Sequence, residues 1–296
     1  MEAWRAATAG AAALMMSRRG TPLLAAVMDG ARLVRRRRRD GRAVPTAAGL
    51  APVAAGVAAA AAADDDDRSV RRLYLPVMAG ALAGMVDDAA EGGPRGWRAH
   101  WQSVRDGRPS TGILKAALIG LMAGAAASGG VRRRGAARSI LTGASAVLAA
   151  NALNQLDTGP GRAAGAFVAG YAAVGLMADS TRRDSWLAGL PLAAAVLGYW
   201  PHDRRGAVMM GDTGANALGA ALGWMAGESL SLRRLVAWTA TLLAVNGLLD
   251  RWSLSRWVEL RRAPIRSHRP LGMAMPTRAD GQGAAPAEAK LPSMLG

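Results

Sequence analysis

Apolar runs alternate along the chain with short blocks of charged residues. Most runs are about 14 to 20 residues long, and a helix of about 20 apolar residues can cross a bilayer. The pattern predicts an all-α fold, a polytopic transmembrane helical bundle of about nine spans. We place the spans near residues 3–16, 50–63, 73–86, 112–128, 140–153, 163–178, 186–199, 215–226 and 235–249, with a separate interfacial helix near 21–33.

Many of these runs are rich in alanine and short for a hydrocarbon layer of about 30 Å. A soluble, alanine-rich helical protein is therefore the alternative fold. Beyond about residue 270 the sequence becomes polar and rich in Ala, Pro and Gly, a composition typical of disorder. We divide the chain into an integral membrane domain, residues 1–270, and a polar cytoplasmic tail, residues 271–296.

The charge distribution sets the expected orientation. The chain carries 37 Lys and Arg against 21 Asp and Glu, a net charge of +16, and no Cys. The basic blocks lie between apolar runs, so they suit anionic membrane lipids and topology better than nucleic acid, which we do not expect as a partner. Five arginines at 35–39 precede the second span and four aspartates at 64–67 follow it. This asymmetry predicts that the arginine end is cytoplasmic.

The motif with the clearest chemistry is Met210-Gly211-Asp212-Thr213-Gly214, between a basic loop and an apolar run. An aspartate at such a boundary can cap the helix that follows, or leave its oxygens free for a hard cation. Further acidic residues occupy similar boundaries. Asp87 and Asp88 end the third predicted span, where they oppose the helix dipole, and Asp157 lies on a tight Gly- and Pro-rich hairpin.

With the N-terminus outside, the predicted topology brings all four aspartates to the cytoplasmic face of the cell membrane. Carboxylates at a membrane edge are costly, so we interpret them as one functional site. Oxygen ligands without Cys favour Mg²⁺, or Mn²⁺, over zinc. Arg162, Arg204 and Arg205 are candidates to hold phosphate charge. The combination favours phosphoryl transfer between a soluble nucleotide and a lipid phosphate.

Four motifs in order resemble the polyprenyl-phosphate N-acetylhexosamine-1-phosphate transferases, the glycosyltransferase-4-like membrane enzymes that include phospho-N-acetylmuramoyl-pentapeptide transferase. The resemblance spans about residues 41 to 225 and rests on Pro45-Thr46 before Gly49-Leu50, Asp87-Asp88, Asn154 with Asp157, and Met210 to Gly214 followed by Leu218-Gly219.

The resemblance implies transfer of a sugar-1-phosphate from a UDP-sugar to undecaprenyl or a related polyprenyl phosphate, with magnesium and release of UMP. By position, Asp212 would bind the metal. Asp87 would act on the lipid phosphate as base or positioner, and Asp88 would support it. Asn154 and Asp157 would help to place the nucleotide and metal. We add Thr213 to the substrate-binding residues and a homodimer to the candidate partners.

The chain departs from the family pattern at several positions. Pro160 stands where the family usually has a second Asp in its Asn-Leu-x-Asp-Gly-x-Asp-Gly loop, and Thr158 replaces the first Gly. The family's His-rich motif is missing; we predict that His202 is a loop residue and His268 an exposed tail residue. The Leu-Asp-x-x-Pro-Gly-Arg-Ala form at residues 156–163 and the Ser-Leu-Ser-x-x-x-Glu tail at residues 253–259 resemble a divergent branch of the family. A catalytically silent relative that binds lipid phosphate or scaffolds an envelope assembly is the main alternative, and a transporter is another.

Overall fold

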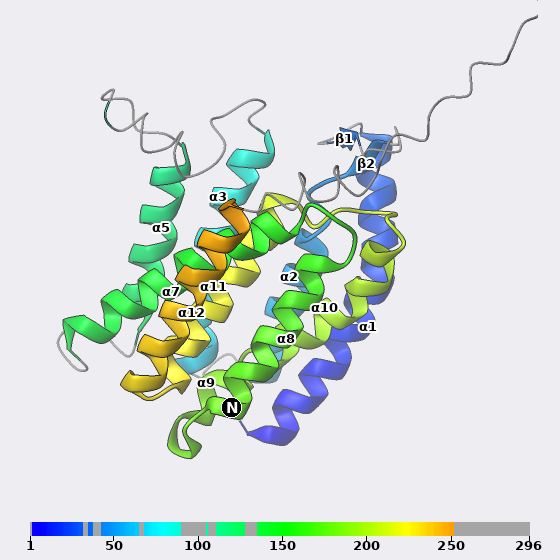
Figure 1. Cartoon of the computed structure of the whole chain (residues 1–296). Helices are drawn as coiled ribbons and strands as arrows, with labels where there is room; N and C mark the ends of the chain where they lie inside the picture. Colours follow the sequence, from blue (N-terminus) through cyan, green and yellow to red (C-terminus); the bar gives the residue numbers. More distant parts are fainter. Residues whose placement is uncertain are drawn as a thin grey trace, which may run out of the picture.

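The structure is a computed structural model and describes residues 2–31, 35–37, 43–64, 68–89, 105, 111–127 and 135–251. Figure 1 shows a single bundle whose helices run roughly along one direction, with α1 at one edge and α5 at the other. The predicted tail, 271–296, and His268 lie outside the described residues. So do residues 38 and 39 of the arginine run and residues 65–67 of the acidic one.

The described residues are almost entirely helical. The helices are α1 (Ala3–Gly30), α2 (Leu50–Asp64), α3 (Arg68–Ala89), α5 (Thr111–Ala126), α7 (Ala136–Leu156), α8 (Arg162–Met177), α9 (Arg183–Leu187), α10 (Leu190–Arg204), α11 (Gly211–Ser229) and α12 (Leu232–Arg251), with a 3-10 turn at Ser180–Arg182. Two short strands, β1 (Arg35–Arg37) and β2 (Ala43–Pro45), pair antiparallel. The helical class is confirmed, and this small β ladder is a feature that the sequence did not predict.

Every predicted span contains a helix, but two boundaries were wrong. The first span and the interfacial helix are one continuous α1, and the seventh predicted span is divided into α9 and α10 at Ala188–Gly189. Among the described residues one helix, Ala136–Leu156, is long and apolar enough to cross a membrane. Three others, Leu50–Ala63, Gly112–Ala126 and Arg162–Met177, are apolar but shorter. The number of spans stays a prediction.

Helix α1 continues through Pro22, which explains the first wrong boundary. Proline has no backbone N–H, so the carbonyl of the residue four positions earlier loses its helical donor. In α1 that carbonyl belongs to Arg18, and the Nε2 atom of His202 lies 3.0 Å from its oxygen. A carbonyl can only accept, so Nε2 carries the proton and donates. His202 is therefore a residue of α10, not of a loop, and it replaces the missing donor of α1.

Helix α11 forms the centre of the bundle. Every one of its residues except Asp212 is buried. It packs most extensively against α7 and α3, and Figure 1 shows it between the two. At its C-terminal end, the buried guanidinium of Arg138 donates to the carbonyls of Gly227 and Leu230. Positive charge at that end also complements the helix dipole.

Small residues allow the close approach of α11 to its neighbours. A Cβ atom at Gly80 would lie 2.5 Å from the carbonyl oxygen of Asn216. A Cβ atom at Gly219 or Gly223 would collide with the backbone of Ala150 or Ala146 on α7. Glycine and alanine seams of this kind let helix backbones touch, as they do in membrane bundles. They fix the position of α11, and with it the position of Asp212.

We expect Gly223→Ala to destabilise the protein by about 1–3 kcal/mol, because the added methyl group meets backbone atoms that cannot rotate away. Gly247→Ala on α12 is the matched control, since among the described residues nothing beyond the adjoining backbone of α12 lies within 4 Å of its Cβ position. The control should leave stability unchanged or raise it by up to about 1 kcal/mol, the helix propensity difference. Thermal unfolding in detergent measures both; equal midpoints for the two variants would contradict the packing described.

Candidate active site

The site is built on the turn that starts α11. Gly211 has a φ of 71°, in the left-handed region that favours glycine. A side chain there would also collide with the carbonyl of Thr46. Both requirements explain why glycine precedes Asp212 in the motif.

The segment before α2 is hydrogen-bonded to this turn. Met209 donates its N–H to the carbonyl of Pro45 at 2.9 Å, and Gly49 donates to the carbonyl of Met210 at 3.1 Å. A Cβ atom at Gly49 would meet the backbone of Gly214 at 2.7 Å. Two of the four sequence motifs, far apart in the chain, thus form one unit.

Two carboxylates from other helices cap α11. Asp88, at the end of α3, accepts the N–H groups of Asp212 (3.1 Å) and Thr213 (2.9 Å) and the hydroxyl of Thr213 (2.7 Å). Asp157, directly after α7, accepts the N–H of Gly211 at 2.8 Å. The first N–H groups of a helix have no acceptor within the helix, so these bonds supply acceptors that the groups would otherwise lack. Three predicted site residues, Asp88, Asp157 and Asp212, therefore meet.

This arrangement bears on the two interpretations of Asp212. The N–H groups of Gly211, Asp212 and Thr213 are occupied by Asp88 and Asp157. The capping of these three positions does not use the Asp212 carboxylate. Because Asp212 is also the one residue of α11 that is not buried, its position favours contact with a ligand over a purely structural cap.

Asp87 has a different neighbour from Asp88. Its carboxylate forms an ion pair with Lys115 of α5, and both side chains are mostly buried. Sequence reasoning missed Lys115, although it is a single charge inside an otherwise apolar run. The pair brings a cation next to the two adjacent carboxylates at the end of α3, where the helix dipole disfavours negative charge.

Asp203 is a second residue that sequence reasoning missed. It lies in the last turn of α10, is almost fully buried, and accepts the N–H of Gly161 at 3.1 Å. Gly161 has a φ of 73° and is the N-cap residue of α8, directly after the Asp157 hairpin. An acid at the end of a predicted span is the same signal that identified Asp87 and Asp88. Applied to residues 199–204, it would have found Asp203.

The carboxylates act on one another. Burial, followed by the negative charge of Asp203, raises the pKa of Asp157 from the ordinary 3.8 to about 8. The charges of Asp212 and Asp88 act in the same direction, and the hydrogen bond from Gly211 opposes them. Burial and the neighbouring acids thus both favour the neutral form of Asp157, whereas a bound cation would favour its ionised form.

The donor set fits a magnesium ion that is shared with a substrate. Within residues that the structure describes, no three His, Cys, Asp or Glu side chains form a ready metal cage. Magnesium does not need one, because it usually takes one or two carboxylates and completes its shell with water and substrate phosphates. Asp212, which is only partly buried and lies near Asp157, could provide one such ligand, and every candidate ligand atom in the cluster is an oxygen.

The remaining predicted residues surround the cluster. Thr213 is fully buried and bonded to Asp88, so its hydroxyl positions that carboxylate. Asn154 lies in the last turn of α7, one turn before Asp157. Arg162 begins α8 and is exposed. Arg204 extends its guanidinium over the ring of Trp200, 5.9 Å from the centroid.

The carboxylate cluster does not coincide with either main groove of the described surface. One groove, of about 390 Å³, lies beside it along α10 and is lined by Leu197, Trp200, Pro201, Arg204 and Arg205. The other lies between α1 and α10. The two predicted arginines, Arg204 and Arg205, thus line a groove next to the carboxylate cluster. No described hydrogen bond or ion pair joins either side chain to the cluster.

We expect metal-free protein to lose stability as pH rises. A carboxyl whose folded pKa is raised stabilises the fold below its unfolded value and loses that contribution as pH passes the folded value, so the window for Asp157 runs from 3.8 to about 8. Asp157→Asn should flatten this slope. Asp203→Asn should make the loss smaller and end it at a lower pH, because a charge that raises the folded pKa of Asp157 is removed.

Thermal midpoints measured in EDTA across this pH range test the expectation. Asp184→Asn, an exposed acid of α9, is the matched control and should keep the wild-type slope. An unchanged slope in Asp157→Asn would show that another group is responsible.

The comparison with known families covers the whole cluster. A model described as glycosyl transferase family 4 matches residues 71–229, more than half of the chain. The match extends from α3 to the end of α11 and includes the five aspartates of the site, Asp87, Asp88, Asp157, Asp203 and Asp212. No curated protein matches the chain. Family members are transferases that act on sugar phosphates and lipid phosphates and are typically membrane-associated. On this match, and with the family's acidic motifs assembled at one end of the bundle, the chain belongs to glycosyl transferase family 4.

Proposed function

We propose that the protein transfers a sugar-1-phosphate from a UDP-sugar to a polyprenyl phosphate at the cytoplasmic membrane face and releases UMP. Family membership supports sugar-phosphate transfer to a lipid phosphate in general. The observation that carries the more specific proposal is the meeting of Asp88, Asp157 and Asp212 at the start of α11. Carboxylates from three helices that share one end of a bundle suit a phosphate–metal site.

The proposed reaction is an exchange of one phosphorus–oxygen bond for another. An oxygen of the acceptor phosphate forms a bond to the β-phosphorus of the UDP-sugar. The bond from that phosphorus to the bridging oxygen breaks, and UMP leaves with this oxygen. A bound magnesium ion supplies charge neutralisation for the diphosphate and the leaving UMP. The protein contributes mainly by positioning the two substrates.

Each aspartate has a proposed role that follows from its position in the site. Asp212 holds the metal, with Asp157 beside it. Asp87 acts on the acceptor phosphate as base or positioner, with Lys115 providing the neighbouring positive charge. Asp88 supports Asp87 by fixing the end of α3 against α11.

Arginines complete the proposed binding site. Arg162, at the start of α8, and Arg204 and Arg205, at the end of α10, provide positive charge for nucleotide phosphates. Asn154 helps to place the nucleotide.

A silent relative that binds lipid phosphate without turnover is the second candidate, and Pro160 favours it because an acid is absent from the loop. Asp203 supports the active alternative. Its carboxylate comes from α10 and binds the backbone of the residue directly after Pro160. The carboxylate of Asp203 thus provides negative charge near Pro160, the position at which the loop lacks an acid.

The first experiment uses Asp212→Asn. This change keeps the shape of the side chain but removes the charge that binds a cation. Because Asp88 and Asp157 cap α11, the variant should remain folded, and without metal it should be at least as stable as wild type. We expect it to lose UMP release and the magnesium-dependent rise in thermal midpoint. Detergent-purified protein, magnesium, polyprenyl phosphate and a panel of UDP-sugars provide the assay.

Asp184→Asn is again the control and should keep both properties. Undiminished turnover in Asp212→Asn would remove this residue from the mechanism. Absence of both turnover and a magnesium shift in wild type would support the silent relative.

The second experiment tests the multi-pass arrangement. The chain has no Cys, so single cysteines report their own location. Arg205→Cys lies at the carboxylate end of the bundle, and Asp184→Cys lies in α9 at the opposite end (Figure 1). An impermeant maleimide applied to intact cells should label Asp184→Cys and leave Arg205→Cys unlabelled until the cells are opened. Labelling of both from the same side would contradict the proposed topology.

A further inference from the structure

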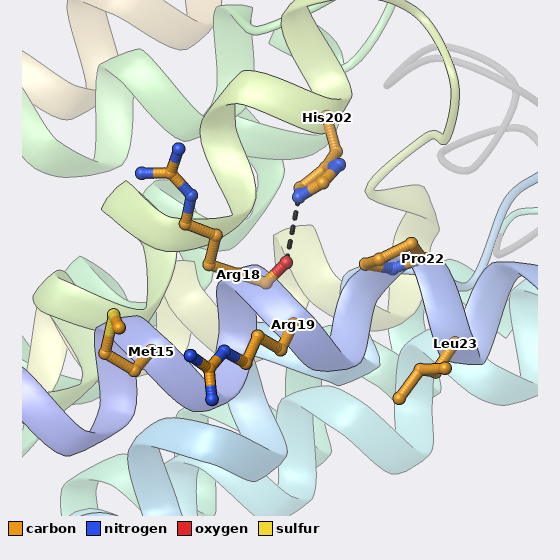
Figure 2. Close-up of a pocket in the computed structure, with 6 residues that line it drawn as sticks. All are labelled: Met15, Arg18, Arg19, Pro22, Leu23 and His202. Carbon is orange, nitrogen blue, oxygen red and sulfur yellow. Dashed lines mark hydrogen bonds between the residues drawn. The ribbon is translucent and has the colours of Figure 1, made fainter.

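A groove of about 540 Å³ lies between α1 and α10, away from the capped start of α11. Met15, Arg18, Arg19, Pro22, Leu23 and His202 line it. Figure 2 shows the five α1 residues along one stretch of that helix and His202 facing them from α10. The lining combines apolar side chains with two guanidinium groups and contains no acidic residue.

The two arginines have positive charge available for a ligand. Both side chains are exposed, and within the described part of the chain neither guanidinium has an ion-pair partner. Arginine binds phosphate oxygens well, since its planar group can donate two parallel hydrogen bonds. Two consecutive arginines in a groove whose described lining contains no acidic residue therefore favour an anionic ligand.

The apolar part of the groove indicates what else the ligand carries. Met15 is about half exposed and Leu23 two-thirds exposed. They lie on α1 on either side of the arginines, about 12 Å apart along the helix axis at 1.5 Å per residue. Exposed apolar side chains next to cations suit an amphipathic molecule better than a free nucleotide or inorganic phosphate.

His202 shows where the groove lies along the length of the bundle. Its bond to the Arg18 carbonyl joins the middle of α1 to the last turn of α10. The next residue, Asp203, belongs to the carboxylate cluster. Arg18 and Arg19 are consequently at the same end of the bundle as the proposed active site, which the proposed topology places at the cytoplasmic headgroup layer.

We propose that this groove binds an anionic glycerophospholipid of the surrounding membrane. The phosphodiester contacts Arg18 and Arg19, and an acyl chain lies along Met15 toward the membrane interior. The inference rests on the membrane placement in the proposed function, but not on catalysis. A zwitterionic lipid carries its own ammonium group beside the phosphate, so it gains less from the two guanidinium groups of the groove.

Native mass spectrometry of the full-length protein in detergent tests the proposal with phosphatidylglycerol and phosphatidylcholine as probes. We expect wild type to bind phosphatidylglycerol more tightly. Arg18→Gln/Arg19→Gln should weaken that binding about thirtyfold, about fivefold for each basic residue near an anionic group. Arg183→Gln/Arg233→Gln is the matched control. It removes the same charge from exposed residues at the opposite end of the bundle and should keep wild-type affinity.

Several outcomes would overturn the inference: equal binding of the two lipids, equal affinity in the two double variants, or displacement of phosphatidylglycerol by equimolar polyprenyl phosphate. The last result would assign the groove to the acceptor substrate. Thermal midpoints of both double variants establish that each is folded. Asp212→Asn should bind phosphatidylglycerol normally. A protein that binds phosphatidylglycerol as expected but releases no UMP would count against the proposed function alone. A protein that releases UMP but shows no preference for phosphatidylglycerol would count against the groove proposal alone.

Discussion

The hydrogen bonds from the first N–H groups of α11 to Asp88 and Asp157 determine where the rest of the structure lies. They join the ends of α3 and α7 to the start of the central helix. They also place two carboxylates, costly at the C-terminal ends of their own helices, against the positive end of another helix dipole. The same hydrogen bonds therefore satisfy the first N–H groups of α11 and bring together the acidic residues that the proposed chemistry requires.

The same site depends on how closely backbones can approach. A Cβ atom at Gly84 would collide with the backbone of Asp212 and Thr213, and one at Gly211 would collide with that of Thr46. A larger residue at either position would separate the elements before the carboxylates could reach the N–H groups. The hydrogen bonds and the glycine positions thus both depend on direct contact between the end of α3 and the start of α11.

Much of this arrangement was predictable from residue patterns. The helical class, most helix positions and the meeting of Asp88, Asp157 and Asp212 followed from hydrophobic runs and acidic boundaries. The continuity of α1 did not, because Pro22 normally disfavours a helix interior and the compensating donor, His202, is distant in sequence. Lys115 stands out as a single charge in an apolar run, but its pairing with Asp87 depends on the packing of α5 against α3, which no local pattern reveals. Which N–H groups Asp88 accepts depends on tertiary contact, so no sequence pattern reveals it.

The composition of the α3–α11–α7 seams has a consequence for how the sequence can change. Alanine and glycine have no rotamers to lose on folding, so this part of the core forms at little cost in side-chain entropy. For the same reason it has almost no adjustable side chains with which to absorb a substitution. Exposed positions such as Leu176 can exchange one apolar residue for another, whereas at Gly219 or Gly223 even one added carbon requires two helices to move apart. Sequence divergence in this protein should therefore be concentrated on the outside of the bundle.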